Sequence, residues 1–133
     1  MSKNVLVLCT GNSCRSIIAE ALINATCKGV QAYSAGVRAS GVVNENAKKV
    51  LQEKGIWHEE YHSKTLEEVL YVDYDLVVTV CDHAKETCPM FPKAIKTLHV
   101  SFEDPDGEDI EAFYETYEQI QTKLLPKITA VLS

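Results

Sequence analysis

The feature that most restricts the fold is an apolar run that ends in a small, polar loop and continues into a helical pattern. Residues 4–9 read Asn-Val-Leu-Val-Leu-Cys, and a continuous run of branched residues is typical of a parallel strand buried on both faces. The loop from Thr10 to Ser16 contains mainly short side chains. From Ser16 onward, apolar residues recur at helical spacing until near Gly29. A strand, a short loop and a helix in this order indicate an α/β architecture.

The rest of the chain continues the alternation of strands with helices. This alternation predicts a single α/β domain over residues 1–133, built on an open parallel sheet. Pro126 is expected to kink or divide the last helix, because proline has no N–H to donate. We expect strands at residues 30–34, 75–80 and 96–100, a helix capped by Asn44 that ends at Gly55, a short helix opening at Thr65, and a helix over 108–132.

Length, apolar runs and charge narrow the classes of function. The chain of 133 residues can bury one continuous core but is too short for two ordinary domains. No run approaches the roughly 18–20 apolar residues of a membrane span, and residues 5–9 are too few for the core of a signal peptide. By default we expect a cytoplasmic monomer that contacts no membrane. The formal charge of −6 disfavours a general nucleic-acid binder, which would carry a basic stripe.

The five cysteines are the next informative feature. Five is an odd number, and a reducing compartment disfavours structural disulfides, so these thiols are expected to be catalytic groups, metal ligands or core residues. Their spacings do not provide the two pairs of close ligands that a structural zinc site uses. We therefore expect no metal ion.

The loop after the first strand is a candidate anion site. Ligands of open α/β folds sit beyond the carboxyl ends of the strands. A loop of small residues there can turn its N–H groups inward, and the following helix adds about half a positive charge. Gly11 permits a backbone conformation with positive φ, and Asn12 tolerates one while its amide can brace the loop. Arg15 can bring its planar guanidinium over the same anion.

The same field favours the thiolate form of Cys9. A hydroxyl from Ser13 or Ser16 can add a hydrogen bond to its sulfur. An activated nucleophile inside an oxyanion cradle is a group-transfer site. The alternative is that Cys9 merely ends a core strand and that an ordinary turn follows. Cys14 is interpreted as a loop or packing thiol and Cys27 as a core thiol on a helix face.

Residues 9–16, Cys-Thr-Gly-Asn-Ser-Cys-Arg-Ser, resemble the phosphate loop of low-molecular-weight protein tyrosine phosphatases and of the arsenate reductases that share their fold. The similarity extends through residues 33–36, 75–80 and 103–105, and so covers most of the chain. It implies a four-stranded parallel sheet in the order 2-1-3-4, flanked by helices. The oxyanion-binding residues would be Thr10, Gly11, Asn12, Ser13, Cys14, Arg15 and Ser16.

Two later thiols distinguish the two kinds of enzyme. Cys81 follows the strand 75–80, which lies beside the first strand in the implied order, and Cys88 comes seven residues later. Residues 80–89, from Val80 to Pro89, resemble the motif of thioredoxin-coupled arsenate reductases. Reduction of arsenate takes two electrons, which two thiols supply on forming a disulfide, whereas a phosphatase needs neither thiol. The alternative is that Cys81 is a buried small residue and Cys88 incidental.

The resemblance implies a relay of three thiols that detoxifies arsenic. Cys9 attacks arsenate while Asp104 protonates the departing hydroxyl. Cys81 then attacks Cys9 and releases arsenite, and Cys88 converts the Cys9–Cys81 disulfide into Cys81–Cys88, which thioredoxin reduces. No cofactor is implied. The sequence alone does not choose between Asp104 and its neighbour Glu103.

A disulfide between Cys81 and Cys88 implies motion. Seven residues of helix would separate the Cα atoms by about 10 Å, and a disulfide tolerates at most about 7 Å. If residues 82–89 are helical in the reduced protein, oxidation must therefore unwind them.

Similar reductases can hold a structural potassium ion near the loop, with groups that match Asn12, Glu20 and Ser34 plus an aspartate. Here the corresponding stretch reads His-Ser-Lys-Thr over residues 62–65, so a threonine stands at the place of the aspartate and Lys64 lies next to it. We expect no potassium ion, and the Lys64 ammonium is the candidate replacement.

Two other functions are compatible with these residues. The first is a low-molecular-weight tyrosine phosphatase, although Ile17 stands where those enzymes usually have proline and they lack the later thiol pair. Weak hydrolysis of aryl phosphates is expected in either case, because the loop is shared. The second is a redox-sensing or anion-binding module that uses the same disulfide as a switch. Arsenate-dependent oxidation of NADPH with thioredoxin and thioredoxin reductase separates all three.

Overall fold

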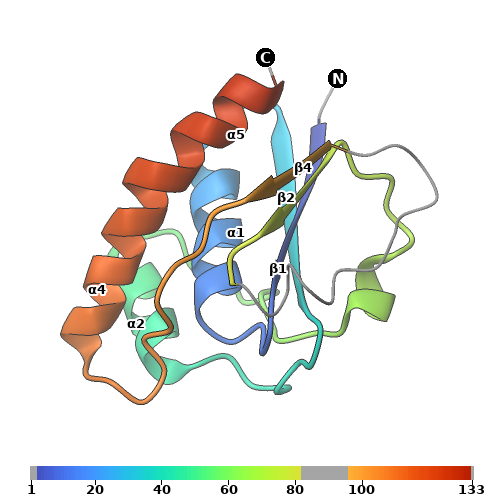
Figure 1. The fold of residues 1–133 in the computed structure, drawn as a ribbon. Helices are drawn as coiled ribbons and strands as arrows, with labels where there is room; N and C mark the ends of the chain where they lie inside the picture. The colour runs from blue at the N-terminus through green and yellow to red at the C-terminus, as the bar shows by residue number, and fades with distance from the viewer. Residues whose placement is uncertain (1–2, 82–95, 133) are drawn as a thin grey trace.

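The computed structural model describes residues 3–81 and 96–132, which form a parallel sheet with helices packed on it (Figure 1). Its four strands follow the order β2-β1-β3-β4, and every neighbouring pair is parallel. The predicted order 2-1-3-4 is therefore confirmed. The strands are β1 (Lys3–Cys9), β2 (Val30–Gly36), β3 (Leu76–Thr79) and β4 (Lys96–His99).

The first strand, β1, is central and pairs along its whole length. Its partners in β2 run from Val30 opposite Lys3 to Gly36 opposite Cys9. The strand β2 therefore continues two residues beyond the predicted end at Ser34, because this pairing holds it in place. Residues 5–9 of β1 are buried, as expected for a strand covered on both faces.

The helices begin where local sequence signals predict. The helix α1 (Arg15–Thr26) packs on β1 and β2, and α2 (Glu45–Glu53) is capped by Asn44, whose side chain accepts from two backbone N–H groups. Thr65 and Glu68 form the expected capping box of a single 3-10 turn, η1 (Leu66–Val69). Every residue from Ser16 to Ile23 is buried, so α1 is anchored in the core from its first turn.

The C-terminal helix is divided, as predicted, but not by a break at Pro126. It consists of α4 (Ile110–Gln119), a π-helical turn η2 (Ile120–Leu124) and α5 (Leu125–Leu132), which follow one another without interruption (Figure 1). Proline lacks the N–H that would bond to the carbonyl four residues earlier, and a wider turn just before it accommodates that loss. In Figure 1, α1, α4 and α5 lie on one side of the sheet and η1 on the other.

Candidate active site

The carboxyl ends of β1 and β3 bring two of the predicted thiols to one edge of the sheet. Cys9 is the last residue of β1, and Cys81 comes two residues after β3. Both are buried, and the Thr10 hydroxyl lies 3.3 Å from the Cys81 sulfur. Cys88 and the predicted rearrangement of residues 82–89 lie outside the described residues.

Four carbonyls, that of Cys9 at the end of β1 and those of three residues in the loop that follows, point away from the centre of the loop. They accept hydrogen bonds from the segment 37–44. Because the C=O and the following N–H of a trans peptide point in opposite directions, the next amide in each case faces the inside of the loop. The Asn12 amide does so, donating to the Cys9 sulfur at 3.2 Å. The loop is thus a preformed nest of N–H groups. The outward bonds join Cys9 to Val37, Thr10 to Arg38, Gly11 to Ser40, and Ser13 to Asn44 at 2.9–3.0 Å.

The left-handed residue of the loop is Asn12, with φ of 50°, and not Gly11. Of the two residues predicted to accept a positive φ, it is Asn12 that adopts one. Asparagine is among the residues that tolerate this conformation best, and here its side chain makes three hydrogen bonds that fix it. The amide nitrogen donates to Ser16 and Ser34, and the amide oxygen accepts from the backbone of Lys64.

The Cys9 sulfur receives its second hydrogen bond from Ser16, not from Ser13. The Ser16 hydroxyl lies 2.8 Å from the sulfur, whereas the Ser13 hydroxyl lies 3.6 Å from the Cys14 sulfur. In addition, α1 has no side-chain cap at Cys14. Its first N–H groups therefore remain available to an anion.

The direction of the hydrogen bonds behind Cys9 follows from the donors. Ser34 donates to the Glu20 carboxylate at 2.6 Å, so its oxygen is free to accept from Asn12 at 2.9 Å. The other hydrogen of the Asn12 amide goes to Ser16 at 2.7 Å. The single Ser16 proton is then left for the Cys9 sulfur, which is the arrangement that stabilises a thiolate.

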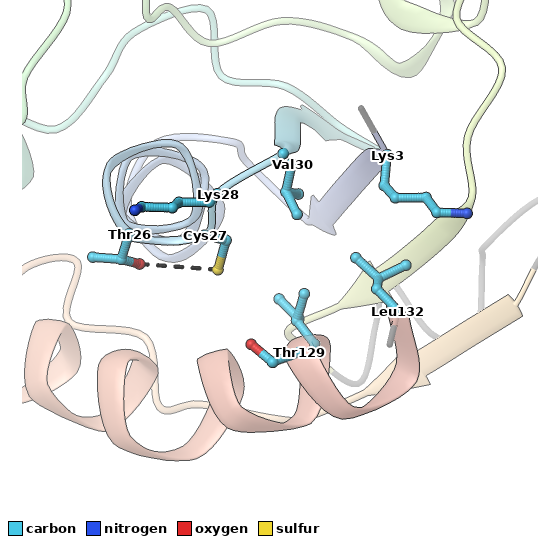
Figure 2. Close-up of a pocket in the computed structure, with 9 residues that line it drawn as sticks. Lys3, Thr26, Cys27, Lys28, Val30, Thr129 and Leu132 are labelled. Carbon is cyan, nitrogen blue, oxygen red and sulfur yellow. Dashed lines mark hydrogen bonds between the residues drawn. The ribbon is translucent and has the colours of Figure 1, made fainter. Parts of the chain in front are cut away.

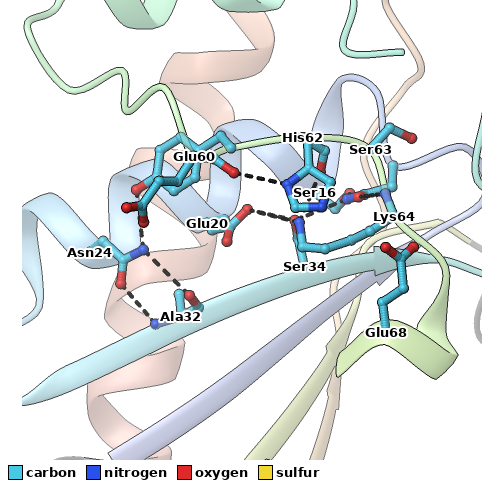
Figure 3. Close-up of polar contacts among 12 residues, drawn as sticks. Ser16, Glu20, Asn24, Ala32, Ser34, Glu60, His62, Ser63, Lys64 and Glu68 are labelled. Atoms are coloured by element: carbon cyan, nitrogen blue, oxygen red, sulfur yellow. Dashed lines mark hydrogen bonds and ion pairs between the residues drawn. The ribbon is translucent and has the colours of Figure 1, made fainter. Parts of the chain in front are cut away.

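A buried ion pair lies at the far end of this chain of hydrogen bonds (Figure 3). The Lys64 ammonium lies 3.8 Å from Glu20, 3.4 Å from the Ser34 hydroxyl and 2.9 Å from the carbonyl of His62. Burial raises the pKa of Glu20 and lowers the pKa of Lys64, and the attraction between the two groups opposes both changes. The predicted set Asn12, Glu20 and Ser34 is thus brought together, with Lys64 among them.

Arg15 and Asp104 are also brought together. One guanidinium nitrogen of Arg15 donates to the carbonyl of Phe102 at 3.1 Å, and the other lies 3.4 Å from the Asp104 carboxylate. Half of the Asp104 side chain is exposed, so the ion pair adds little stability. Its effect is to hold the guanidinium beside the loop. Glu103 is exposed.

The remaining described cysteines differ from Cys9 in their surroundings. Cys14 is buried, and burial, with smaller contributions from nearby acidic groups, raises its pKa to about 12. This thiol stays protonated and fits the predicted packing role. Cys27 caps the end of α1, where it is half-buried and packs against the hydrophobic core. The predicted contact with the core is therefore present, but at the end of the helix and not on its face.

Sequence reasoning missed two residues that shape the loop. The Ser63 hydroxyl donates to the carbonyl of Gly11 at 2.9 Å and accepts from the N–H of Gly41 at 3.0 Å. Gly36 lies directly beneath the loop, where a Cβ atom would come within 2.6 Å of the Thr10 carbonyl oxygen. Both contacts join residues far apart in the sequence, and no local pattern identifies them.

A separate cleft of about 490 Å³ opens at the other edge of the sheet, where β1 and β2 begin (Figure 2). Its lining includes Lys3, Cys27, Lys28 and Leu132. It is therefore remote from the loop. Within the described ranges, no helix is long and apolar enough to cross a membrane, and no group of three or more His, Cys, Asp or Glu side chains could hold a metal ion.

Comparison with known proteins gives a consistent family. Residues 4–132 match the family of low molecular weight phosphotyrosine protein phosphatases. An arsenate reductase of Brevibacillus brevis is 36% identical over 127 residues, which cover 92% of this chain and 91% of that protein. The crystal structure of an arsenate reductase from Archaeoglobus fulgidus has a TM-score of 0.80 and 33% identity, covering 94% of this chain and 98% of the other. A tyrosine phosphatase of Erwinia amylovora has a TM-score of 0.81 and 25% identity, covering 98% and 93%.

Proposed function

This chain belongs to the low molecular weight phosphotyrosine protein phosphatase family, and we propose that within it the chain is an arsenate reductase. The names of the Brevibacillus and Archaeoglobus relatives support this choice. The observation that carries it is the second thiol, Cys81, at the rim of the anion loop. Hydrolysis of a phosphate ester has no use for that thiol, whereas transfer of two electrons to arsenic requires it.

The strand register supports a disulfide between Cys9 and Cys81. Because Leu8 is paired with Thr79, Cys81 lies one residue beyond the position opposite Cys9. Two such positions have Cα atoms about 6 Å apart, since parallel neighbours lie about 4.8 Å apart and rise about 3.3 Å per residue. A disulfide needs a Cα separation of about 4.4–6.8 Å. The bond therefore requires little movement of the strands.

The first step is attack of the Cys9 thiolate on arsenic. The loop amides and the Arg15 guanidinium bind the arsenate oxygens. They can do so because these positively polarised groups already surround the anion position before arsenate arrives. Asp104, beside Arg15, gives a proton to one arsenate hydroxyl, which leaves as water. The product is a Cys9–arsenic(V) adduct.

The second step transfers the electrons. The Cys81 thiolate attacks the Cys9 sulfur, so that a sulfur–sulfur bond forms and the sulfur–arsenic bond breaks. The electron pair of the broken bond stays on arsenic, which leaves as arsenite. The Cys88 thiolate then attacks Cys81 and frees the Cys9 thiolate. The dithiol of thioredoxin reduces the resulting Cys81–Cys88 disulfide, which fits a monomeric enzyme of the reducing cytoplasm.

The test is arsenate-dependent NADPH oxidation in the presence of thioredoxin and thioredoxin reductase. Cys9→Ser should abolish both turnover and hydrolysis of an aryl phosphate, because a hydroxyl is a far weaker acid than a thiol and does not supply the attacking anion. Cys81→Ser and Cys88→Ser should stop turnover but retain the slow hydrolysis. Cys27→Ser is the matched control and should behave as the unsubstituted protein.

Two outcomes would overturn the proposal. Rapid aryl-phosphate hydrolysis without arsenate turnover would identify a phosphatase. Full arsenate turnover in Cys81→Ser would remove the relay. The predicted unwinding of residues 82–89 has its own readout, which is a comparison of backbone chemical shifts between the reduced and the Cys81–Cys88 oxidised protein.

A further inference from the structure

The Lys64 ammonium is one of few buried charges among the described residues, and the proposed reaction does not use it directly. It is 7% exposed, and the Glu20 carboxylate beside it is 5% exposed. The cluster lies behind the anion loop, between α1 and the end of β2 (Figure 3). Two charges are rarely buried without a role, because burial of an ion carries a large desolvation penalty.

The backbone of Lys64 is fixed at both of its polar groups. Its N–H donates to the Asn12 side chain at 2.9 Å, and its carbonyl accepts from Gly36 at 2.9 Å. The first bond sets which end of the Asn12 amide faces the serines. The second attaches Lys64 to the last residue of β2. The side chain therefore leaves a rigid anchor and returns toward Glu20 and Ser34.

The oxygen atoms around the ammonium form the kind of cage that a monovalent cation would use. They are the Glu20 carboxylate, the Ser34 hydroxyl and the His62 carbonyl. The cage carries one negative charge from Glu20, and one ammonium neutralises it. A metal ion bound here would have to share the same oxygens with the ammonium and would leave an uncompensated positive charge in the interior.

The neighbouring residue supplies no further ligand. Thr65 takes the position at which the family motif has an aspartate, and its hydroxyl bonds to Glu68 at 3.2 Å. The residues present therefore do not fit a potassium ion. We infer that Lys64 is the resident cation of this site and acts as a positioning residue, which orders Glu20, Ser34 and Asn12 so that Ser16 donates to the Cys9 sulfur.

The consequence is that the protein needs no metal cation to form its nucleophile site. Its thermal stability and its affinity for inorganic phosphate should be the same in potassium, sodium and tetramethylammonium chloride at equal ionic strength. A specific gain in potassium would overturn the inference. The effect on arsenate turnover rests on the proposed function, but these two measurements do not.

Substitution of the lysine provides the sharper test. Lys64→Met keeps the length of the side chain and removes the charge, while the backbone bond to Asn12 remains. We expect alkylation of Cys9 by iodoacetamide at neutral pH, followed by mass spectrometry of its peptide, to slow by about tenfold, the order expected for one charge-assisted hydrogen bond. Lys28→Met is the matched control, because Lys28 is exposed at the far edge of the sheet, and it should leave the rate unchanged.

Two further variants separate positioning from stability. Lys64→Ala opens the cage, so potassium should restore its phosphate affinity and Cys9 alkylation more than tetramethylammonium does, whereas Lys64→Met fills the space and should not respond. Glu20→Gln combined with Lys64→Met removes both charges. We expect this double variant to be thermally more stable than Lys64→Met, because it leaves no unpaired buried charge. Alkylation of Cys9 should remain slow, because the amide introduced at position 20 can donate to Ser34 and so reverse the direction of the hydrogen bonds that lead to Cys9. An alkylation rate within twofold of the unsubstituted protein in both Lys64→Met and the double variant would overturn the inference.

Discussion

Gly36 ends β2 directly beneath the anion loop, and the absence of a side chain there lets two stretches of backbone approach closely. A Cβ atom at this position would lie 2.6 Å from the Thr10 carbonyl oxygen, 3.0 Å from the Asn12 nitrogen and 3.1 Å from the Ala39 Cα. All three are backbone atoms, so no side chain can rotate to make room. Gly36→Ala must therefore move the strand or the loop.

These contacts set the size of the movement. Ordinary van der Waals separation of about 3.4 Å requires a shift of about 0.8 Å away from the Thr10 oxygen. Overpacking of this kind typically costs about 1–3 kcal/mol of stability. The β2 strand is paired with β1 over seven positions, so the loop is the part expected to move. A misplacement near 1 Å lowers catalytic efficiency by about a hundredfold.

The assay combines three measurements on purified Gly36→Ala protein. They are the free energy of unfolding in urea, the affinity for inorganic phosphate by calorimetry, and arsenate turnover. Gly11→Ala is the control for stability, because its added Cβ would meet only the Ser13 hydroxyl, at an ordinary 3.5 Å. We expect Gly36→Ala to lose stability and Gly11→Ala to retain it. Unchanged stability and unchanged phosphate affinity in Gly36→Ala would refute the reasoning.

Arg15→Lys should weaken phosphate binding by at least about tenfold, because an ammonium cannot contact Phe102, Asp104 and an anion with the planar geometry of a guanidinium; calorimetry would contradict this by giving equal affinities. Cys14 should stay unmodified by iodoacetamide at pH 8 while Cys9 reacts, because burial raises the pKa of Cys14 to about 12. Since that pKa lies above the unfolded value of 9.0, Cys14 contributes stability below pH 9 that is lost as the pH rises toward 12. The measurement is the free energy of unfolding in urea at pH 8 and at pH 11. If Cys14→Ala loses as much stability between these two pH values as the unsubstituted protein does, the prediction is wrong.

The architecture was largely predictable from local patterns. The buried run of β1, the Asn44 cap and the Thr65 capping box each depend on neighbours a few residues away, and each is found as expected. The sequence predicted that the last helix would be kinked or divided at Pro126, but not that a π-helical turn would precede this residue. Proline signals that a hydrogen bond is lost, but the packing of the whole helix decides how the chain accommodates the loss.

In the candidate site too, local sequence patterns identified some residues, whereas others depend on contacts between distant parts of the chain. Cys9 and Ser16 could be identified because a strand, a loop and a helix are contiguous in the sequence, whereas the choice of Asn12 over Gly11 for the left-handed position was not. That choice depends on the bond from the Lys64 backbone to the Asn12 side chain, across 52 residues. Contacts of this range, like that of Ser63 with Gly11, are set by packing that no local pattern encodes.

The outward hydrogen bonds of the anion loop also bear on how such a protein can diverge. The segment 37–44 holds the loop with its backbone N–H groups, and its side chains at Arg38, Ser40 and Val42 are exposed at the surface. Substitution at these positions by any residue other than proline retains the N–H groups that bond to the carbonyls of the cradle. The rim can therefore accumulate changes in charge and bulk at little structural cost, and what is attached to the oxyanion can change while the oxyanion itself is still bound.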